Sequence, residues 1–264
     1  MCPTWLCLLA VLISTPAAAQ LSAAFRAQTL DMPPFSVSVD PAKQEMQGYF
    51  GEIFVAAMRQ AGLMDKIAVD MIPWKRAQQN ALTQANVVIF PLIRTAARES
   101  QYRWLALILE EPCYAWTTRP ELPIDSLEQV RQAGKIGGLA GGPQTTEVRR
   151  ILGADYADQV EDSASEELAL RKMLAGRTHM WSAHGITADH VARQYARLNQ
   201  LPEIKLRRGY KFFDANIWIA VSKQTSESDA QQLQQALDAF LLTEDYQAIN
   251  RKYQIAGRSQ ASAQ

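Results

Sequence analysis

Apolar residues follow two alternating patterns along this chain. Short apolar runs predict strands, whereas apolar positions three and four residues apart predict helices. In the first hundred residues the predicted order is strand, helix, strand, helix and strand, at 25–30, 51–61, 67–72, a helix opening at Trp74, and 87–92. This order is typical of parallel strands joined by right-handed helical crossovers. We therefore expect an α/β fold.

The remainder of the chain mixes the same elements less regularly. We expect helices at 127–133, 145–152, 166–174, 229–242 and 245–253, and strands at 135–139, 180–183 and 213–221. Gly137, Gly138, Gly141 and Gly142 crowd the end of the strand at 135–139. Because the G-x-G-x-x-G spacing is not kept, a tight strand-to-helix turn is a safer interpretation than a dinucleotide-binding loop.

The first nineteen residues carry no charged side chain and end in three alanines after an apolar run. This pattern predicts a signal peptide at 1–19, cut before Gln20, and the run is shorter than a membrane helix requires. We therefore expect an exported, soluble protein, with a disordered tail at 256–264. Only Cys113 remains after cleavage. We expect it to be a buried structural thiol, since no histidine motif pairs with it as in a catalytic cysteine.

Lysine plus arginine balance aspartate plus glutamate at 27 each, so no overall field attracts nucleic acid or an anionic membrane. Signatures of hydrolases, metalloproteases and phosphate-binding loops are absent. His179, His184 and His190 lie close in sequence, but their spacing does not place them on one face. We therefore predict no catalytic activity, no metal and no cofactor.

Polar side chains follow the strand at 87–92. Arg94, Thr95 and Arg98 lie just past its carboxyl end, the edge at which ligands bind in open α/β sheets. A guanidinium can bind a carboxylate through two hydrogen bonds. For any single arginine the alternative is a solvated turn.

Several stretches lie, in order, across nearly the whole chain after residue 19. They are MPPF at 32–35, GYFGE at 48–52, PWKRA at 73–77, RTAARE at 94–99, GKIGG at 134–138, LAGR at 174–177 and DYQAINRKY at 245–253. Together they resemble the family 3 extracellular solute-binding proteins, which have the type II periplasmic binding protein fold and serve polar amino acid uptake. The resemblance implies a discontinuous first lobe at 24–116 plus 213–255, a second lobe at 117–212, and a ligand cleft between them.

The resemblance also implies a periplasmic monomer that delivers its small-molecule ligand to an inner-membrane ABC permease. Arg98 would bind a ligand carboxylate, Trp74 together with Phe35 or Met32 would enclose the apolar part, and the turn at 141–145 would donate backbone hydrogen bonds. Trp74 could instead be core packing, and Arg76 a solvated residue of the first helical turn. The full predicted site is Asp31, Phe35, Trp74, Arg76, Arg94, Thr95, Arg98, Gly141, Gly142, Gln144, Thr145 and His184.

One position departs from the family pattern. Binders of α-amino acids usually carry an acidic residue after the strand that follows the A-G-R-type turn, where this chain has Ala183 and His184. A buried ammonium without a carboxylate partner is costly. Either Asp31 or Asp214 supplies the acid, or the ligand is not a standard α-amino acid. His184 could add a pH-sensitive contact near neutrality.

Two alternatives keep the fold and change the function. Some relatives of the family are cyclohexadienyl dehydratases, and such an enzyme would need a general acid or base in the cleft, for which His184 and Glu99 are the candidates. The other alternative is a sensing or scaffold module on the same fold. Nothing in the spacing of the residues favours the enzyme, and we expect a binding protein.

Overall fold

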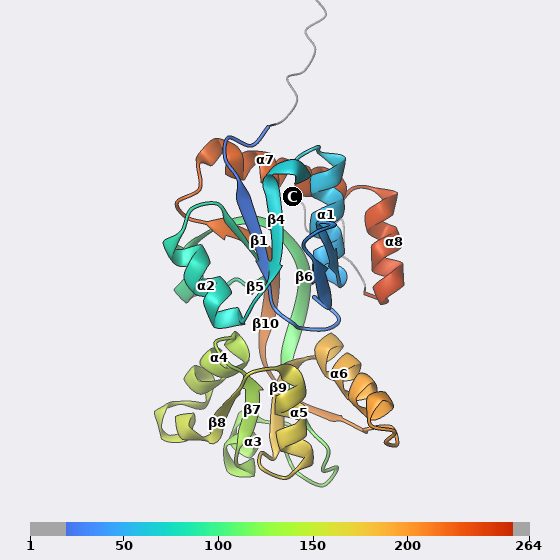
Figure 1. Cartoon of the computed structure of the whole chain (residues 1–264). Coiled ribbons are helices and arrows are strands. Elements are labelled where there is room, and N and C mark those ends of the chain that lie inside the picture. Colours follow the sequence, from blue (N-terminus) through green and yellow to red (C-terminus); the bar gives the residue numbers. More distant parts are fainter. Residues whose placement is uncertain (1–19, 256–264) are drawn as a thin grey trace, which may run out of the picture.

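The computed structural model describes residues 20–255 and is shown in Figure 1. The predicted signal peptide at 1–19 and the predicted tail at 256–264 lie outside the described residues. The elements are β1 (Phe25–Thr29), β2 (Ser38–Asp40), β3 (Glu45–Gln47), α1 (Tyr49–Gln60), η1 (Met64–Lys66), β4 (Ile67–Met71), α2 (Trp74–Thr83), β5 (Val87–Ile93), η2 (Ala96–Arg98), β6 (Tyr102–Thr117), α3 (Leu127–Ala133), β7 (Ile136–Leu139), α4 (Pro143–Leu152), η3 (Ala154–Gln159), β8 (Val160–Ser163), α5 (Glu166–Leu174), β9 (Met180–His184), α6 (Gly185–Leu198), β10 (Arg207–Ser222), α7 (Glu227–Phe240) and α8 (Glu244–Tyr253).

The main sheet has the strand order β4-β1-β5-β10-β6-β9-β7-β8. β1 pairs in parallel with β4 and β5, which confirms the parallel pairing predicted for the first hundred residues. β7 likewise pairs in parallel with β8 and β9. Between these two parallel groups, β10 runs antiparallel to β5 and β6, and β6 runs antiparallel to β9. The two long central strands, β6 and β10, therefore join two groups of parallel strands within one sheet.

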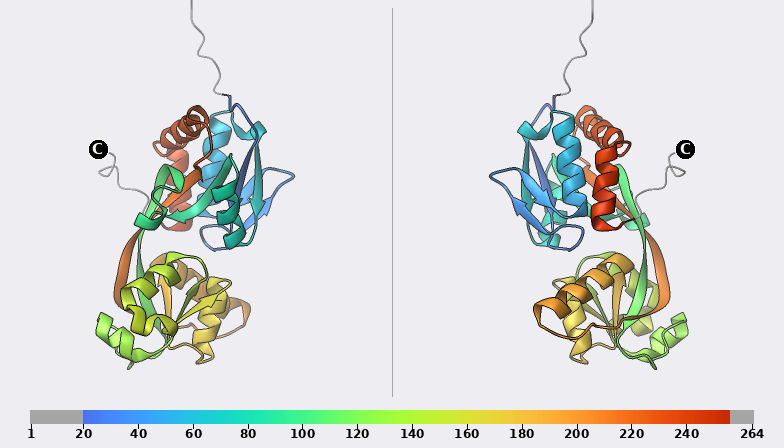
Figure 2. Two further views of the ribbon diagram at one scale, coloured as in Figure 1. Left: turned by 90° about the vertical axis from the view of Figure 1, so that its left-hand side faces the viewer. Right: turned by 90° about the vertical axis from the view of Figure 1, so that its right-hand side faces the viewer.

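Two bodies lie at the ends of β6 and β10, as Figures 1 and 2 show. The upper body contains β1, β4, β5, α1, α2, α7 and α8, and the lower body contains β7 to β9 and α3 to α6. On β6 the upper core ends at Leu109 and the lower cores begin at Cys113. On β10 the lower core includes Phe212, Phe213 packs against both cores, and the upper core resumes at Ala215. The lobe limits at 116/117 and 212/213 remain a prediction.

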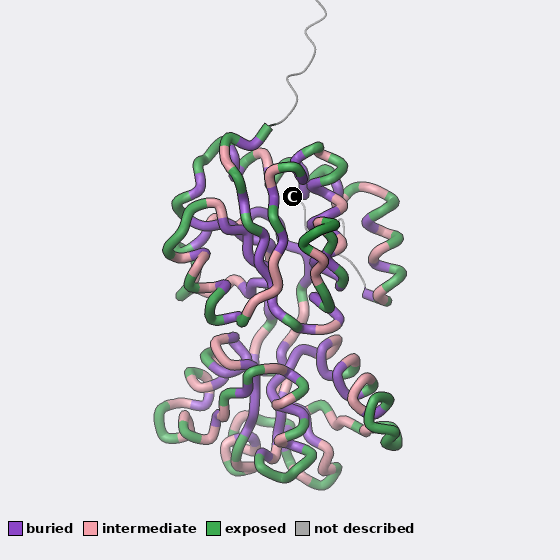
Figure 3. Tube along the Cα trace, viewed as in Figure 1, coloured by how far each residue is buried: buried purple, intermediate pink, exposed green. Residues whose placement is uncertain are grey.

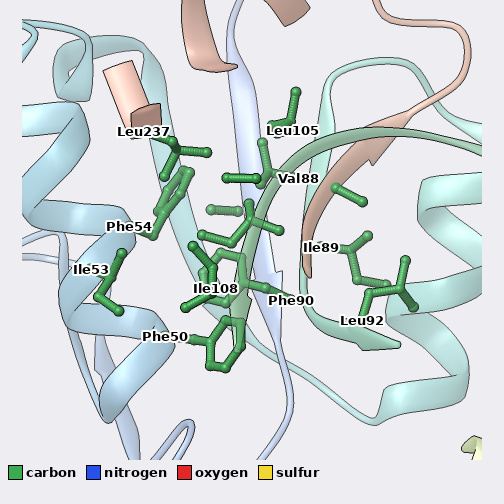
Figure 4. Packing of buried hydrophobic residues seen from close by; sticks show 14 of the residues in the cluster. Phe50, Ile53, Phe54, Val88, Ile89, Phe90, Leu92, Leu105, Ile108 and Leu237 are labelled. Atoms are coloured by element: carbon green, nitrogen blue, oxygen red, sulfur yellow. The ribbon is translucent and has the colours of Figure 1, made fainter. Parts of the chain in front are cut away.

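α1 packs its apolar face against the upper sheet. Figure 4 shows Ile53 and Phe54 of α1 pointing toward Phe90 and Ile108 of the strands, and the rings of Phe54 and Phe90 lie 5.1 Å apart. All four side chains are fully buried, and each such residue stabilises the fold by roughly 1.5 to 3 kcal/mol. Figure 3 shows the same division along the chain, with buried positions on the strands and exposed ones on the outer loops.

Cys113 is fully buried on β6, which confirms the prediction of a buried thiol. Its Sγ lies 3.4 Å from the hydroxyl oxygen of Ser182, and burial raises the pKa of the thiol. Since the thiolate is the reactive form, this side chain is inert at neutral pH. In the part of the chain that the structure describes, no helix combines the length and apolar character needed to cross a membrane.

Candidate ligand cleft

The two bodies meet at a small cavity that both of them line. Its residues are Leu30, Met32, Trp74, Pro91, Ile93, Arg98 and Ile217 from the upper body and Leu139, Gly142, Pro143 and Gln144 from the lower body. Leu139 also packs into the upper hydrophobic core. The cavity holds about 20 Å³, room for about one water molecule, whereas ligand pockets commonly measure roughly 300 to 1,000 Å³. The two walls are therefore in contact with each other.

Arg98 joins the two walls. The chain turns after β5 through η2, and Nη1 of Arg98 donates back to the carbonyl oxygen of Ile93 at 3.2 Å. Nη2 donates to Oε1 of Gln78 at 2.9 Å and to the carbonyl oxygen of Gly141, in the other body, at 3.0 Å. All three partners are neutral oxygens, and desolvation lowers the pKa of Arg98. A guanidinium in this position favours an anionic partner.

No carboxylate of the described residues forms an ion pair with Arg98. The charge of Glu147 raises the pKa of Arg98 without a salt bridge between them, and the Glu147 carboxylate pairs with Nε of Arg150 at 2.8 Å. Gln78, which sequence reasoning missed, holds Arg98 from α2. Gln78 lies four residues after Trp74 in α2, so the two side chains share one face of the helix. The spacing to Trp74 was therefore the signal in the sequence that could have identified Gln78.

The turn between β7 and α4 presents the second wall. Gly141 adopts a φ of +75°, which favours glycine, and Gly142 is the N-cap of α4 with Pro143 at its first position. The hydroxyl of Thr145 donates to the carbonyl oxygens of Leu139 at 3.0 Å and Gly142 at 3.2 Å. Thr145 is fully buried and therefore holds the turn from behind.

Gln144 is the polar side chain of this turn that lines the cavity. It is 1% exposed, its Nε2 donates to Oε1 of Glu166 at 3.3 Å, and its Oε1 has no hydrogen-bond partner. Glu166 also accepts a hydrogen bond from Nε1 of Trp181 at 3.0 Å, and burial raises its pKa to about 7. Sequence reasoning missed Glu166, because a glutamate at a helix start is usually an exposed residue that interacts with the helix dipole.

Solved structures of several proteins share this architecture. A histidine kinase sensor domain described as similar to periplasmic binding proteins has a TM-score of 0.73 at 16% identity, covering 88% of this chain and 96% of its own. The arginine-, lysine-, histidine-binding protein ArtJ from Geobacillus stearothermophilus has a TM-score of 0.70 at 16% identity, covering 87% and 94%. The chain has the type II periplasmic binding protein fold.

A third structure with this binding-protein fold is the ancestral amino acid-binding protein AncCDT-1, described as a precursor of cyclohexadienyl dehydratase. Its TM-score is 0.67 at 15% identity, with 89% of this chain and 95% of that chain covered. No protein-family model matches the sequence. A comparison with curated protein sequences finds no match either.

The apolar wall of the cavity agrees with the predicted one only in part. Trp74, 8% exposed at the start of α2, lines the cavity as expected. Phe35 does not, because the chain after Met32 folds back so that the backbone N–H of Ser36 donates to the Met32 carbonyl oxygen. This turn directs Phe35 into the core, edge-on to Phe50 with ring centroids 5.7 Å apart. Met32, the alternative to Phe35 in the sequence prediction, lines the cavity.

Arg94 lies on the same turn as Arg98 but has its own partners. Its Nε donates to Oε2 of Glu99 at 2.8 Å, and its guanidinium carbon lies 5.3 Å and 4.8 Å from the ring centroids of Trp104 and Trp218. Neither Arg94 nor Thr95 lines the cavity. The carbonyl oxygen of Thr95 accepts the backbone N–H of Arg98, which starts the turn.

The other charged candidates also lie outside the cavity lining. Arg76 is exposed on α2, as in the solvated alternative. Asp31 is exposed after β1, and partial desolvation together with the nearby charge of Glu167 raises its pKa. Asp214 pairs with Lys211 at 2.9 Å. Of the two acids considered for a ligand ammonium, only Asp31 therefore remains without an ion pair among the described residues.

His184 is fully buried at the end of β9. Its Nδ1 lies 3.2 Å from the carbonyl oxygen of Glu111, and burial lowers its pKa to about 4. The predicted pH-sensitive contact near neutrality is therefore wrong, because the ring is removed from water and stays neutral there. The carboxylate of Glu111 accepts the backbone N–H of Ile186 at 3.1 Å and caps α6. No group of His, Cys, Asp or Glu within residues 20–255 is arranged to hold a metal ion.

Proposed function

We propose that the protein is a periplasmic solute-binding protein that captures a small polar ligand bearing a carboxylate, an amino acid or a related compound, for an ABC-type permease of the inner membrane. It acts as a monomer and leaves the ligand unchanged. The observation that carries the proposal is Arg98, a desolvated guanidinium at the contact between the two bodies whose partners are all neutral. The amino acid ligands named for ArtJ support the same class.

Ligand entry requires the bodies to separate. The cavity of about 20 Å³ is far too small for an amino acid, and Nη2 of Arg98 is occupied by the Gly141 carbonyl oxygen. β6 and β10 are the strands shared by both bodies, so a bend along them opens the cleft. A ligand carboxylate then replaces neutral oxygens at Arg98 with a charged acceptor, which strengthens the hydrogen bonds.

The enzyme alternative lacks its predicted residues at the cavity. His184 is buried and neutral, and Glu99 is exposed and paired with Arg94. The structural similarity to a histidine kinase sensor domain supports the sensing alternative. A sensor also binds its ligand in the cleft, so it differs from the proposal in the partner and not in the site.

A thermal-shift screen of the purified chain against amino acids, small carboxylates, amines and oligopeptides tests the proposal. A carboxylate at about 100 times its Kd should stabilise the protein by roughly 2.7 kcal/mol. Arg98→Ala should weaken binding by about 2 kcal/mol or more, because it removes a desolvated charge partner. Arg94→Ala, on the same turn but paired with Glu99, is the matched control and should keep the affinity.

Three outcomes contradict the proposal. One is that no carboxylate shifts the transition of the wild-type protein, which favours a module without a ligand. Another is that Arg98→Ala binds as tightly as the wild type. The last is that mass spectrometry shows conversion of the bound compound, which establishes an enzyme.

A further inference from the structure

A buried polar group stands behind the lower wall of the cleft. Gln144 is 1% exposed and Glu166 is 3% exposed, and they are joined by a hydrogen bond between α4 and the start of α5. Neither Glu166 nor the orientation of the Gln144 amide has a part in the carboxylate binding assigned to Arg98. Burial of a carboxylate costs free energy unless hydrogen bonds or a positive charge stabilise it.

The carboxylate of Glu166 fixes the orientation of the Gln144 amide. Ser165 already caps α5 by accepting the backbone N–H of Leu168, so the Glu166 side chain is free to turn inward. Its Oε2 accepts the indole N–H of Trp181 and its Oε1 accepts Nε2 of Gln144. An ionised carboxylate only accepts hydrogen bonds, so the amide must direct its N–H₂ group toward Glu166.

The other end of the amide is then an acceptor without a donor. Oε1 of Gln144 is buried and has no hydrogen-bond partner within the described part of the protein. Gln144 itself lines the cavity next to Gly142 and Pro143. Because buried polar atoms are nearly always hydrogen-bonded, an orphan acceptor in a cleft wall indicates a donor on the ligand.

We propose that Glu166 is a positioning residue that holds the carbonyl oxygen of Gln144 toward the cleft, so that the ligand carries an α-amine, protonated to an ammonium group, as well as the carboxylate that Arg98 binds. This inference rests on the proposed function. It explains how the cleft selects an amino compound although His184 stands where an acidic residue is expected. The amide supplies the acceptor, and the carboxylate behind it supplies the negative charge.

The groups around Glu166 leave its charge unopposed. Trp181 faces it from β9, Gln144 from α4, and the neutral thiol of Cys113 lies nearby on β6. No lysine or arginine pairs with it among the described residues. Burial raises the pKa of Glu166 to about 7. Below that pH the protonated acid donates to Gln144, the amide turns, and its N–H₂ group faces the cleft and repels a cationic nitrogen.

Matched pairs of compounds test the inference. The probes are arginine, glutamine and glutamate, each compared by calorimetric titration with the carboxylic acid of the same skeleton that lacks the α-amine. At pH 8 the wild-type protein should bind the better amino compound roughly 10-fold or more above its partner, the value of one hydrogen bond to a charged group. At pH 5.5 this preference should fall.

Two variants separate positioning from folding. Glu166→Gln keeps an acceptor for Trp181 but presents an N–H₂ donor to Gln144, as the protonated acid does, so the Gln144 amide turns and the preference should shrink and lose its pH dependence. Gln144→Leu leaves Glu166 intact and should lose the preference while carboxylate binding through Arg98 remains. Glu167→Gln, at the exposed neighbouring position, is the control for removing an acidic charge from α5 and should behave as the wild type.

Failure of the inference differs from failure of the proposed function. Equal binding of each amino compound and its deaminated partner at both pH values, with loss of both in Arg98→Ala, overturns the role of Glu166 and leaves the binding function intact. A preference that survives in Gln144→Leu and Glu166→Gln also overturns it. Absence of any carboxylate binding in the wild type overturns the proposed function itself.

Discussion

Arg94 and Arg98 lie four residues apart on the turn after β5, yet their guanidinium groups have different surroundings. Arg94 pairs with Glu99 and lies against two tryptophan rings, so its charge is satisfied outside the cavity. Arg98 reaches across to the Gly141 carbonyl oxygen and has only neutral partners. The same residue type therefore stabilises the turn at one position and, under the proposed function, binds the ligand at the other.

Glu166 gives a pH-dependent stability that can be measured without a ligand. Its pKa rises from the ordinary 4.5 to about 7 on folding. Its contribution to the free energy of unfolding is therefore fully present below about pH 4.5. This contribution, roughly 3 kcal/mol in total, is lost as the pH rises through 7. Glu166→Gln should gain stability relative to the wild type from pH 5 to pH 8 in urea unfolding. A difference that stays constant with pH contradicts the buried, titrating carboxylate.

The turn between β7 and α4 is the element that carries the lower wall. Gly141 presents its carbonyl oxygen to Arg98 because its φ of +75° turns the backbone there, and Thr145 fixes the turn from behind. A side chain at this position strains the backbone. The backbone conformation of Gly141 therefore determines whether its carbonyl oxygen reaches Arg98 in the other body.

Gly141→Ala should destabilise the protein and weaken ligand binding together. A left-handed conformation costs an alanine roughly 1 to 2 kcal/mol, and relief of that strain moves the carbonyl oxygen away from Arg98. Gly62→Ala is the matched control, since Gly62 has a φ of +71° after α1 with open space around it. Both variants should lose similar stability in urea unfolding. Equal ligand affinity in the two contradicts the role of the turn.

Some helices and strands could be predicted from the sequence and others could not. α1 was predicted because large apolar residues such as Ile53, Phe54 and Met58 recur at helical spacing. α6 was missed, because its buried face consists of small or polar residues, among them Thr187, Ala188 and Ala192, and begins at a glycine. β8 was missed because Val-Glu-Asp-Ser has no apolar run; it is a strand through pairing with β7.

The candidate site was predictable in part for a similar reason. A motif places Trp74, Arg98 and the glycine turn near one sheet edge, but it does not give the direction of a side chain. Phe35 turned into the core and His184 became fully buried through tertiary packing. Glu166 could not be distinguished from an ordinary first-turn glutamate until the structure placed Gln144 and Trp181 against it.

At the scale of the whole molecule, two bodies with separate cores share two sixteen-residue strands, β6 and β10. At the cavity the two bodies contact each other through polar groups, Arg98 and Gln78 with the Gly141 carbonyl oxygen, and through Leu139. Such a contact can break and form again while each body keeps its own hydrophobic core intact. The arrangement suits capture of a small molecule between the bodies.

The most direct test of this account is a crystal structure of the protein with the carboxylate that binds best in the screen. The account predicts the ligand between the two bodies, with its carboxylate about 2.7 to 2.9 Å from the guanidinium nitrogens of Arg98 and a nitrogen facing Oε1 of Gln144. A ligand bound outside the cleft, or a carboxylate held by residues other than Arg98, would contradict it.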